Sequence, residues 1–148
     1  MEIMDYLDAM GKAKKEYLRY LEPVCKDRSL TQNELAVLLF LYNNPGRDRA
    51  ADIVACRGIA KSHVSLAVSN LERRGILQRR FEPSDRRTCH LELTRSGRDI
   101  AQEGRERQHL FFEALYTGVS QEEQEQMQRL SRKILNNIAS FEQRKPEI

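Results

Sequence analysis

Small hydroxyl side chains recur on one side of residues 61–73. With about 100° between successive residues of a helix, Val64, Val68 and Leu71 share one face, and polar residues occupy the other. That polar face carries one apolar side chain, Leu66. Short hydroxyls let a helix approach base edges and phosphates closely, and an exposed apolar group suits a thymine methyl. Such a face would suit a helix that enters the major groove of DNA.

Basic side chains lie near the start of the same segment. Free N–H groups and the helix dipole favour phosphate at a helix N-terminus, where Lys61 and His63 lie. The alternative is an ordinary surface helix with a solvated face, and this helix alone does not separate the two. The residues expected to contact DNA from it are Lys61, Ser62, His63, Ser65, Leu66, Ser69 and Arg73.

Two strand-like runs follow the helix and enclose a polar, basic loop. Residues 76–81 and 89–93 are predicted to pair, with the turn-favouring sequence EPSDRRT between them. Arg86 and Arg87 would lie at the hairpin tip with no core to pack into. Arginine there suits the minor groove or phosphates, whereas the alternative role is solubility. Asp85 is expected to hold Arg87 and fix its direction.

Positive charge is concentrated on this part of the chain. Residues 57–98 contain ten Lys or Arg and four Asp or Glu, a net charge of +6, whereas the whole chain carries +3. The remaining residues therefore sum to −3. A basic segment with a groove-sized helix and a basic hairpin is the electrostatic signature of a DNA-binding protein.

Helices are predicted around the basic segment. Gly75 is expected to end the helix before the hairpin, and Thr94 to cap the helix after it. Capping boxes formed by Thr31 with Glu34 and by Ser120 with the Glu three residues later begin two further helices. Apolar residues recur at helical spacing in residues 5 to about 24, 31–41, 95–117 and 120–141, and residues 50–74 have the pattern of a helix-turn-helix.

The predicted fold is mainly α with a small β-hairpin wing. The 148 residues suit a single domain, with a winged helix-turn-helix lobe at 30–98 and a helical dimerisation region at 1–29 and 99–148. A lobe of this size needs little extra covering, so we expect the terminal helices to form a two-fold interface, although an intrachain helical layer is the alternative. The side chains that require such a surface are Leu7, Met10, Tyr17, Phe111, Phe112, Ile134, Ile138 and Phe141.

Three segments resemble the MarR family of bacterial and archaeal transcription regulators. They are LTQNELAVLLFL at 30–41, IAKSHVSLAVSNLERRGIL at 59–77 and DRRTCHLELTRSGR at 85–98, within a likeness that runs from about Tyr6 to Phe141. The resemblance implies an obligate homodimer on a pseudo-palindromic operator, with recognition helices about one DNA turn (~34 Å) apart. Ala60 departs from the Ser or Thr usual at this helix start, which weakens the cap by roughly 1 kcal/mol.

The resemblance also implies control by a small phenolic ligand, a metal or an oxidant. A ligand site is expected in the crevice between the dimer helices and the DNA-binding lobe. Relatives that sense oxidants use a cysteine in the first helix, and Cys25 lies late for that role. Cys56 and Cys89 are expected to be small packing residues. The candidate effector-binding residues, all equally suited to the core, are Tyr6, Met10, Tyr17, Leu38, Tyr42 and Phe111.

Enzymatic and metal chemistry have no support in the sequence. There is no nucleophile–base signature and no glycine-rich phosphate loop, and the histidines at 63, 90 and 109 lack metal-ligand spacing. We expect no enzyme activity, no cofactor and no metal. No apolar run approaches the ~18 residues of a membrane span, and the acidic start at 1–10 does not suit a signal peptide. A cytoplasmic protein without a membrane partner is expected.

The favoured function is a sequence-specific regulator of transcription that binds double-stranded DNA as a homodimer and responds to a small-molecule effector as a repressor. Alternatives are an architectural DNA binder with little sequence preference, a winged helix that binds protein instead of DNA, and a redox-responsive regulator that uses Cys25. The net +6 of residues 57–98 and the arginine pair at the wing argue against a purely protein-binding role.

Overall fold

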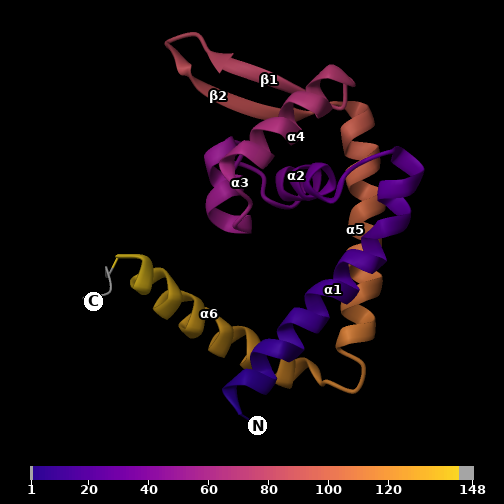
Figure 1. Cartoon of the computed structure of the whole chain (residues 1–148), viewed down its shortest axis with the longest axis vertical. Coiled ribbons are helices and arrows are strands. Elements are labelled where there is room, and N and C mark those ends of the chain that lie inside the picture. The colour runs from indigo at the N-terminus through magenta and orange to yellow at the C-terminus, as the bar shows by residue number, and fades with distance from the viewer. Residues whose placement is uncertain (1, 144–148) are drawn as a thin grey trace. The chain divides into compact units, whose positions relative to one another are not determined.

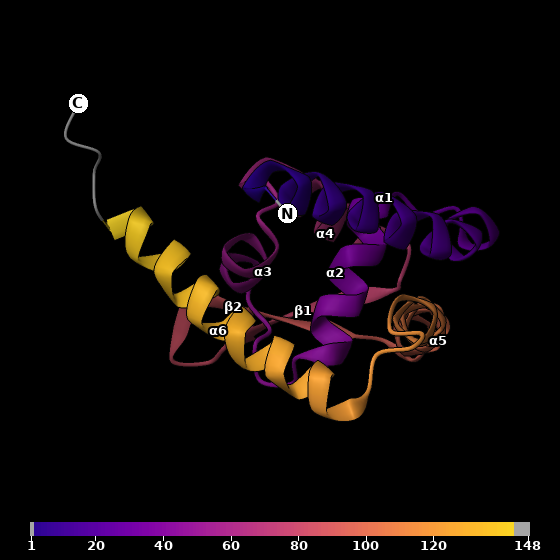
Figure 2. The ribbon, with the colours of Figure 1, turned by 90° about the horizontal axis from the view of Figure 1, so that it is seen from below.

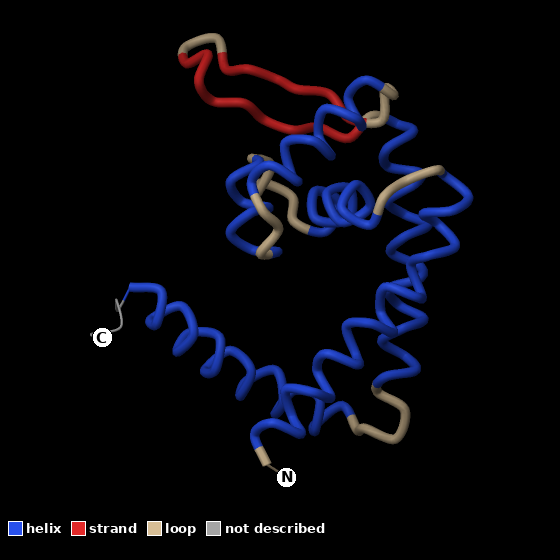
Figure 3. Tube along the Cα trace, viewed as in Figure 1, coloured by secondary structure: helices blue, strands red, loops and turns tan. Residues whose placement is uncertain are grey.

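The structure, a computed structural model, describes residues 2–143. Contacts divide the chain into two units after Phe111. Helices and one hairpin make up the described residues, as Figures 1 and 3 show, and this confirms the predicted mainly α fold with a small wing. The elements are α1 (Ile3–Arg28), α2 (Gln32–Asn43), α3 (Ala50–Arg57), α4 (Lys61–Arg73), β1 (Leu77–Glu82), β2 (Asp85–Leu93), α5 (Arg95–Leu115) and α6 (Gln121–Gln143).

Helix α2 forms the centre of the first unit. Its residues from Leu35 to Phe40 are almost all buried, and α2 contacts both α1 and α4 (Figure 2). The helix begins at the predicted capping box, because Thr31 Oγ1 accepts the N–H of Glu34 at 3.1 Å and the Glu34 carboxylate accepts the N–H of Thr31 at 3.1 Å. The buried helix provides the core on which the other helices of the lobe are placed.

Helices α3 and α4 form the predicted helix-turn-helix. Gly58 adopts a left-handed conformation (φ 63°) and separates them. Helix α4 begins directly after Ala60, whose side chain offers no cap, as the sequence suggested. The predicted phase of α4 is confirmed, because Val64, Val68 and Leu71 are buried against the core. Because the apolar face of α4 packs against the core, its opposite face points to solvent.

The hairpin differs from the prediction in the length of its loop. The sequence suggested an open loop over 82–88, but strand β2 already begins at Asp85, and Pro83 and Ser84 alone connect the strands. Register runs from Leu77 opposite Leu93 to Phe81 opposite Cys89, and then shifts so that Glu82 lies opposite Asp85. Residues 86–88 form a bulge, which increases local twist and redirects side chains.

The start of α5 fixes the base of the hairpin. Thr94 Oγ1 accepts the N–H of Gly97 at 3.2 Å, which confirms the predicted N-cap. A side chain at position 97 would collide with the backbone carbonyl of Ile76, so glycine is required where α5 passes the residue before β1. Further along α5, a Cβ on Gly104 would lie 3.0 Å from Leu39 Cδ2, so the helix packs closely on α2.

Helix α1 extends beyond the predicted end near residue 24. It continues through Pro23 to Arg28, and Ser29 adopts a left-handed conformation. The guanidinium of Arg74 donates to the carbonyls of Ser29 at 2.8 Å and Arg28 at 2.7 Å, and thereby satisfies two carbonyls at the helix end. This long-range cap explains why the local sequence did not reveal the last turn.

The second unit contains α6. Its start is the predicted capping box, in which Glu123 N donates to Ser120 Oγ at 3.2 Å and Ser120 N donates to Glu123 Oε2 at 2.8 Å. The apolar stripe of α6 is exposed within this chain. Residues 144–148 of the expected dimerisation region lie outside the described residues. Across the described part of the chain, no helix combines the length and apolarity that crossing a membrane requires.

Candidate nucleic-acid interface

The outer face of α4 is exposed along its length. Leu66 is 61% exposed, whereas Val64, Ala67 and Val68 on the opposite face are buried. An exposed leucine among hydroxyls has little to contribute to the stability of the isolated chain, and its burial would stabilise a complex. The seven residues predicted to contact DNA from this helix are all exposed, namely Lys61, Ser62, His63, Ser65, Leu66, Ser69 and Arg73.

Arg79 joins the base of the wing to α4. Its Nη2 donates to Ser69 Oγ at 3.3 Å, and its Nε lies 3.4 Å from Glu72 Oε2. Ser69 is therefore partly engaged inside the protein, although its side chain stays exposed. These contacts place the hairpin and the exposed helix face in one connected surface.

Asp85 organises the wing tip through the backbone. Its Oδ1 accepts the N–H of Arg87 at 2.9 Å and its Oδ2 accepts the hydroxyl of Thr88 at 2.8 Å. The backbone N–H of Arg87 and then the Thr88 hydroxyl lower the pKa of Asp85 below its usual range. The expected contact between Asp85 and the guanidinium of Arg87 is therefore wrong in detail, because the carboxylate fixes the main chain of the bulge instead.

The wing arginines are free of carboxylates. Arg86 and Arg87 are exposed, and within the described part of the chain neither guanidinium forms an ion pair or a hydrogen bond. Arg80, by contrast, is paired with Glu92 across the strands. The two tip arginines therefore keep their full hydrogen-bonding capacity for phosphates or a minor groove.

Several basic residues counted in the net +6 have structural partners. Arg74 caps α1, Arg73 donates to Asn70 Oδ1 at 3.0 Å, and Arg57 lies over the ring of Phe40 at 5.5 Å. The sequence count therefore overstates the charge that is available to a partner. Within the described residues, the basic side chains of this segment that form no ion pair, hydrogen bond or ring contact are Lys61 at the start of α4, Arg86 and Arg87 at the wing tip, and Arg95 and Arg98 at the start of α5.

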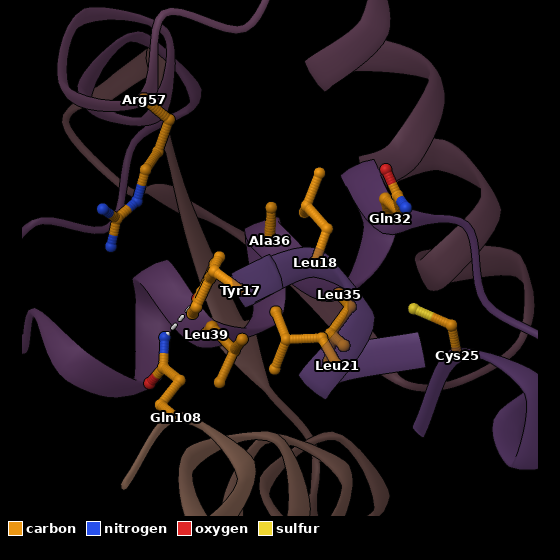
Figure 4. Close-up of a pocket in the computed structure, with 10 residues that line it drawn as sticks. All are labelled: Tyr17, Leu18, Leu21, Cys25, Gln32, Leu35, Ala36, Leu39, Arg57 and Gln108. Atoms are coloured by element: carbon orange, nitrogen blue, oxygen red, sulfur yellow. Dashed lines mark hydrogen bonds between the residues drawn. The ribbon is translucent and has the colours of Figure 1, made fainter. Parts of the chain in front are cut away.

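A small cavity lies among α1, α2, the end of α3 and α5. It has a volume of about 90 Å³. Figure 4 shows Gln108 beside Tyr17, and Gln108 Nε2 donates to the Tyr17 hydroxyl at 2.6 Å. The lining residues are Tyr17, Leu18, Leu21, Cys25, Gln32, Leu35, Ala36, Leu39, Arg57 and Gln108.

Only one of the predicted effector-binding residues lines this cavity. That residue is Tyr17, whose ring also meets Phe111 edge-on, with centroids 5.4 Å apart. Leu38 is fully buried in the core, and Tyr42 lines a separate surface groove beside Leu91 and Arg98. The remaining two, Tyr6 and Met10, are exposed on the first half of α1.

The cavity residues that the sequence did not reveal are mostly apolar, and Gln32, Arg57 and Gln108 are the polar ones. Arg57 and Gln108 come from segments 51 residues apart, and no local pattern relates them. The position of Arg57 at the end of a short helix before Gly58 was a usable signal, because basic residues are favoured at helix ends. That signal identifies a helix terminus and does not identify a cavity.

The cysteine predictions need one correction. Cys56 is exposed and is not a packing residue, because it lies on the outer side of the last turn of α3. Cys89 is half-buried beside the core, as expected. Cys25 is half-buried, and burial, followed by the charges of Glu22 and Glu34, raises the pKa of its thiol. A raised pKa disfavours the thiolate that oxidant sensing requires.

The three histidines lie apart from one another. His63 is on α4, His109 is on α5, and His90 on β2 contacts Asp48 and Glu82. Among the described residues, no group of three or more His, Cys, Asp or Glu is arranged to hold a metal ion.

Comparisons with known proteins agree on one family. A sequence model of the MarR family matches residues 28–88, which span the end of α1 to the wing tip. The transcriptional repressor MprA of Escherichia coli is 29% identical over 119 residues, a match that covers 80% of this chain and 68% of MprA.

Solved structures show the same fold. A MarR family regulator from Silicibacter pomeroyi superposes with a TM-score of 0.80 at 20% identity and covers 99% of this chain and 93% of its own. BpsR of Bordetella bronchiseptica, whose DNA binding is regulated by 6-hydroxynicotinic acid, has a TM-score of 0.68 at 23% identity and covers 90% of this chain and 98% of its own. Together with the sequence matches, these findings show that residues 28–88 resemble the MarR family and that the chain has the winged helix-turn-helix fold of MarR family regulators.

Proposed function

We propose that the protein is a homodimeric repressor that binds a pseudo-palindromic operator and releases it when a small organic anion binds. The observation that carries the DNA-binding part is the continuous surface formed by the outer face of α4 and the wing. Leu66 and the hydroxyls are exposed there because the opposite face of α4 is fully used in the core. The contacts of Arg79 with Ser69 and Glu72 join this helix to the wing.

The two parts of this surface have different roles. The face of α4 enters the major groove, where hydroxyls and Leu66 select bases. Arg86 and Arg87 add affinity through the minor groove or phosphates, with little dependence on sequence. Asp85 contributes indirectly, since it holds the backbone of the bulge that carries both arginines. Repression by MprA supports a repressor role for this chain.

Dimerisation is supported by apolar side chains that the chain leaves exposed. Within the first unit, the initial half of α1 exposes Leu7 and Met10, and within the second unit α6 exposes Leu130, Ile134 and Ile138. Burial of each such side chain contributes roughly 1.5–3 kcal/mol, and two-fold symmetry counts each residue twice. A second copy of this chain is the partner that covers them.

The effector proposal rests on the cavity beside Tyr17. Its walls are apolar, and among the described lining residues Arg57 is the one with a charge. A carboxylate is the natural partner of a guanidinium, so the effector is a small apolar or aromatic acid. A volume of about 90 Å³ is below the ~300–1,000 Å³ of typical ligand sites, so the hydrogen bond between Tyr17 and Gln108 must open to admit one ring.

The route from cavity to DNA runs through α3. Arg57 is the last residue of α3 and lies over Phe40 of α2. A bound carboxylate would compete with the ring of Phe40 for the guanidinium and move the end of α3, which packs on α4. Small displacements of a packed helix are sufficient to separate two dimer-related recognition helices from their half-sites.

A footprint combined with a salt titration tests the proposal. The purified protein is expected to protect a two-fold symmetric site in the DNA upstream of its own gene or a neighbouring one. It should bind that site at least about 10³-fold more tightly than random DNA at physiological salt. Equal affinity for both DNAs would instead identify an architectural DNA binder, and no binding to either would exclude the proposed interface.

A further inference from the structure

The imidazole of His90 lies between two carboxylates from different parts of the fold. Its Nδ1 is 2.7 Å from Asp48 Oδ1, and its Nε2 is 2.8 Å from Glu82 Oε1. Asp48 belongs to the loop between α2 and α3, whereas Glu82 is the last residue of β1 before the turn of the wing. The His90 side chain is 14% exposed, so the imidazole is enclosed and not merely near these groups.

The same loop also holds the backbone of the wing. Leu91 N donates to the carbonyl oxygen of Asp48 at 2.7 Å. Within the described part of the chain, two side-chain hydrogen bonds connect the hairpin to the rest of the lobe. Arg79 makes one with α4 near the base of the hairpin, and His90 makes the other with Asp48, closer to the wing tip. Beyond His90, residues 83–87 are exposed.

Both contacts of His90 require the protonated ring. Carboxylates only accept hydrogen bonds, and a neutral imidazole has one N–H, so it can donate to Asp48 or to Glu82 but not to both. Loss of the proton therefore leaves one carboxylate without a donor and removes the positive charge that separates two negative ones.

The surrounding charges favour the protonated form. The hydrogen bonds to Asp48 and then to Glu82 raise the pKa of His90 above its ordinary value of 6.5, while burial and the positive charge of Arg80 oppose the increase. Arg80 lies opposite His90 in the hairpin register and is itself engaged by Glu92.

We infer that His90 is a positioning residue for the wing, and that its imidazolium ties the hairpin to the loop before α3 so that loss of its proton loosens the wing and weakens DNA binding. The inference rests on the proposed contact between the wing and DNA. A two-stranded ribbon has little stability of its own, so Arg86 and Arg87 depend on such anchors for a defined direction.

The sign of the pH dependence follows from the direction of the pKa shift. A histidine whose pKa is raised on folding contributes stabilisation that is complete below its unfolded value and is lost as pH rises through the folded value. Below about pH 6.5 the contacts of His90 with Asp48 and Glu82 should be complete and the wing should keep its position. Above this pH the contacts should be lost progressively, and the wing should become more mobile. DNA phosphates would raise the pKa of His90 further, so bound DNA extends the held range.

The test measures affinity of the full-length protein for a fluorescein-labelled random-sequence duplex, between about pH 6 and pH 8.5, because wing contacts need no operator. Affinity is expected to fall by roughly fivefold or more across this range. His90→Gln, which keeps a donor and cannot titrate, should reduce the change to less than about twofold. His109→Gln, which alters an exposed histidine of α5, is the matched control and should retain the wild-type pH profile.

His63 lies in the proposed DNA contact, so the comparison is repeated in a His63→Gln background. NMR titration of the imidazole carbons provides a readout that is independent of DNA. His90 should titrate above 6.5, and Glu82→Gln should lower its midpoint. This second variant replaces a half-exposed carboxylate on the surface, so it keeps the test valid if His90→Gln does not fold.

An unchanged pH profile in His90→Gln, or a His90 midpoint at or below 6.5, would overturn the inference while leaving the proposed function intact. Absence of DNA binding at every pH would instead contradict the proposed function. A His90 midpoint that is raised and sensitive to Glu82, together with a flattened affinity profile in His90→Gln, would establish the positioning role.

Discussion

The side-chain amide of Asn70 donates a hydrogen bond to Glu34 Oε1 at 3.2 Å. Glu34 is 5% exposed and is the buried charged residue of the core. Its other carboxylate oxygen accepts the N–H of Thr31 at 3.1 Å. One side chain therefore both caps α2 and holds α4, and the Oδ1 of Asn70 continues the chain of contacts to Arg73 on the exposed side.

Glu34→Ala is expected to destabilise the fold by about 1–3 kcal/mol, because it removes two part-buried hydrogen bonds, from the N–H of Thr31 and from the amide of Asn70. Glu123→Ala is the matched control, since it removes the corresponding residue from the exposed capping box of α6 and should cost at most about 1 kcal/mol. Urea unfolding of both variants measures the difference. Equal losses of stability would show that the contact between Glu34 and Asn70 adds nothing.

Replacement of Arg86 and Arg87 by Ala should weaken binding to every DNA sequence and lower the slope of log affinity against log salt by roughly 1–2 units. The reason is that neither guanidinium has a carboxylate partner within the described residues, so both are available to phosphates. Fluorescence anisotropy over a salt series provides the measurement. Arg19→Ala, an exposed arginine of α1 paired with Glu16, should leave the slope unchanged.

Leu66→Glu should abolish sequence-specific binding and change the melting temperature by little. Leu66 is 61% exposed, so the folded chain loses almost no burial, whereas a carboxylate against phosphates and base edges is strongly unfavourable in the complex. Val64→Ala in the same helix provides the contrast, because Val64 is buried and its truncation should cost stability. A large loss of stability in Leu66→Glu would show that the residue is not on an open surface.

Local side-chain chemistry allowed much of this fold to be predicted. The capping boxes at Thr31 and Ser120 and the cap at Thr94 all act within three residues of the chain, and the phase of α4 depends only on helical periodicity. Where the outcome depended on distant partners, the predictions were wrong or incomplete. The end of α1 is held by Arg74, 45 residues away in the sequence.

In the candidate sites, too, the features that depend on local sequence could be predicted, whereas those that depend on distant residues could not. Exposure of the α4 face follows from one helix and its core, so the predicted contact residues could be placed from sequence. The cavity needs four helices to converge, and Arg57 and Gln108 have no shared pattern. The pairing of His90 with Asp48 joins positions 42 residues apart, and only the folded chain brings them together. The bulge at 86–88 likewise depends on register between strands.

A charge within the apolar stripe of α6 should prevent dimerisation. Ile134→Asp places a carboxylate among Leu130 and Ile138, which are exposed in the single chain, and burial of an unpaired charge at an interface is costly. Asn136→Asp lies about 200° around the helix from position 134 and serves as the control. Sedimentation should show a monomer or aggregated protein for Ile134→Asp and a dimer for the control. A stable dimer in both would place the interface elsewhere.

Benzoate, used as a one-ring acid, should weaken DNA binding through the cavity beside Tyr17, and benzyl alcohol at the same concentration should have a much smaller effect. The difference is expected because the charged group that lines the cavity is Arg57, which can form a bidentate pair with a carboxylate but not with a hydroxyl. Arg57→Gln should remove at least about tenfold of the benzoate affinity, measured by calorimetry on the free protein. Lys26→Gln, a nearby cation of α1 paired with Glu22 and absent from the cavity wall, should retain it. Equal responses to the acid and the alcohol would show that the cavity does not select for charge, and unchanged benzoate binding in Arg57→Gln would place the effector outside this cavity.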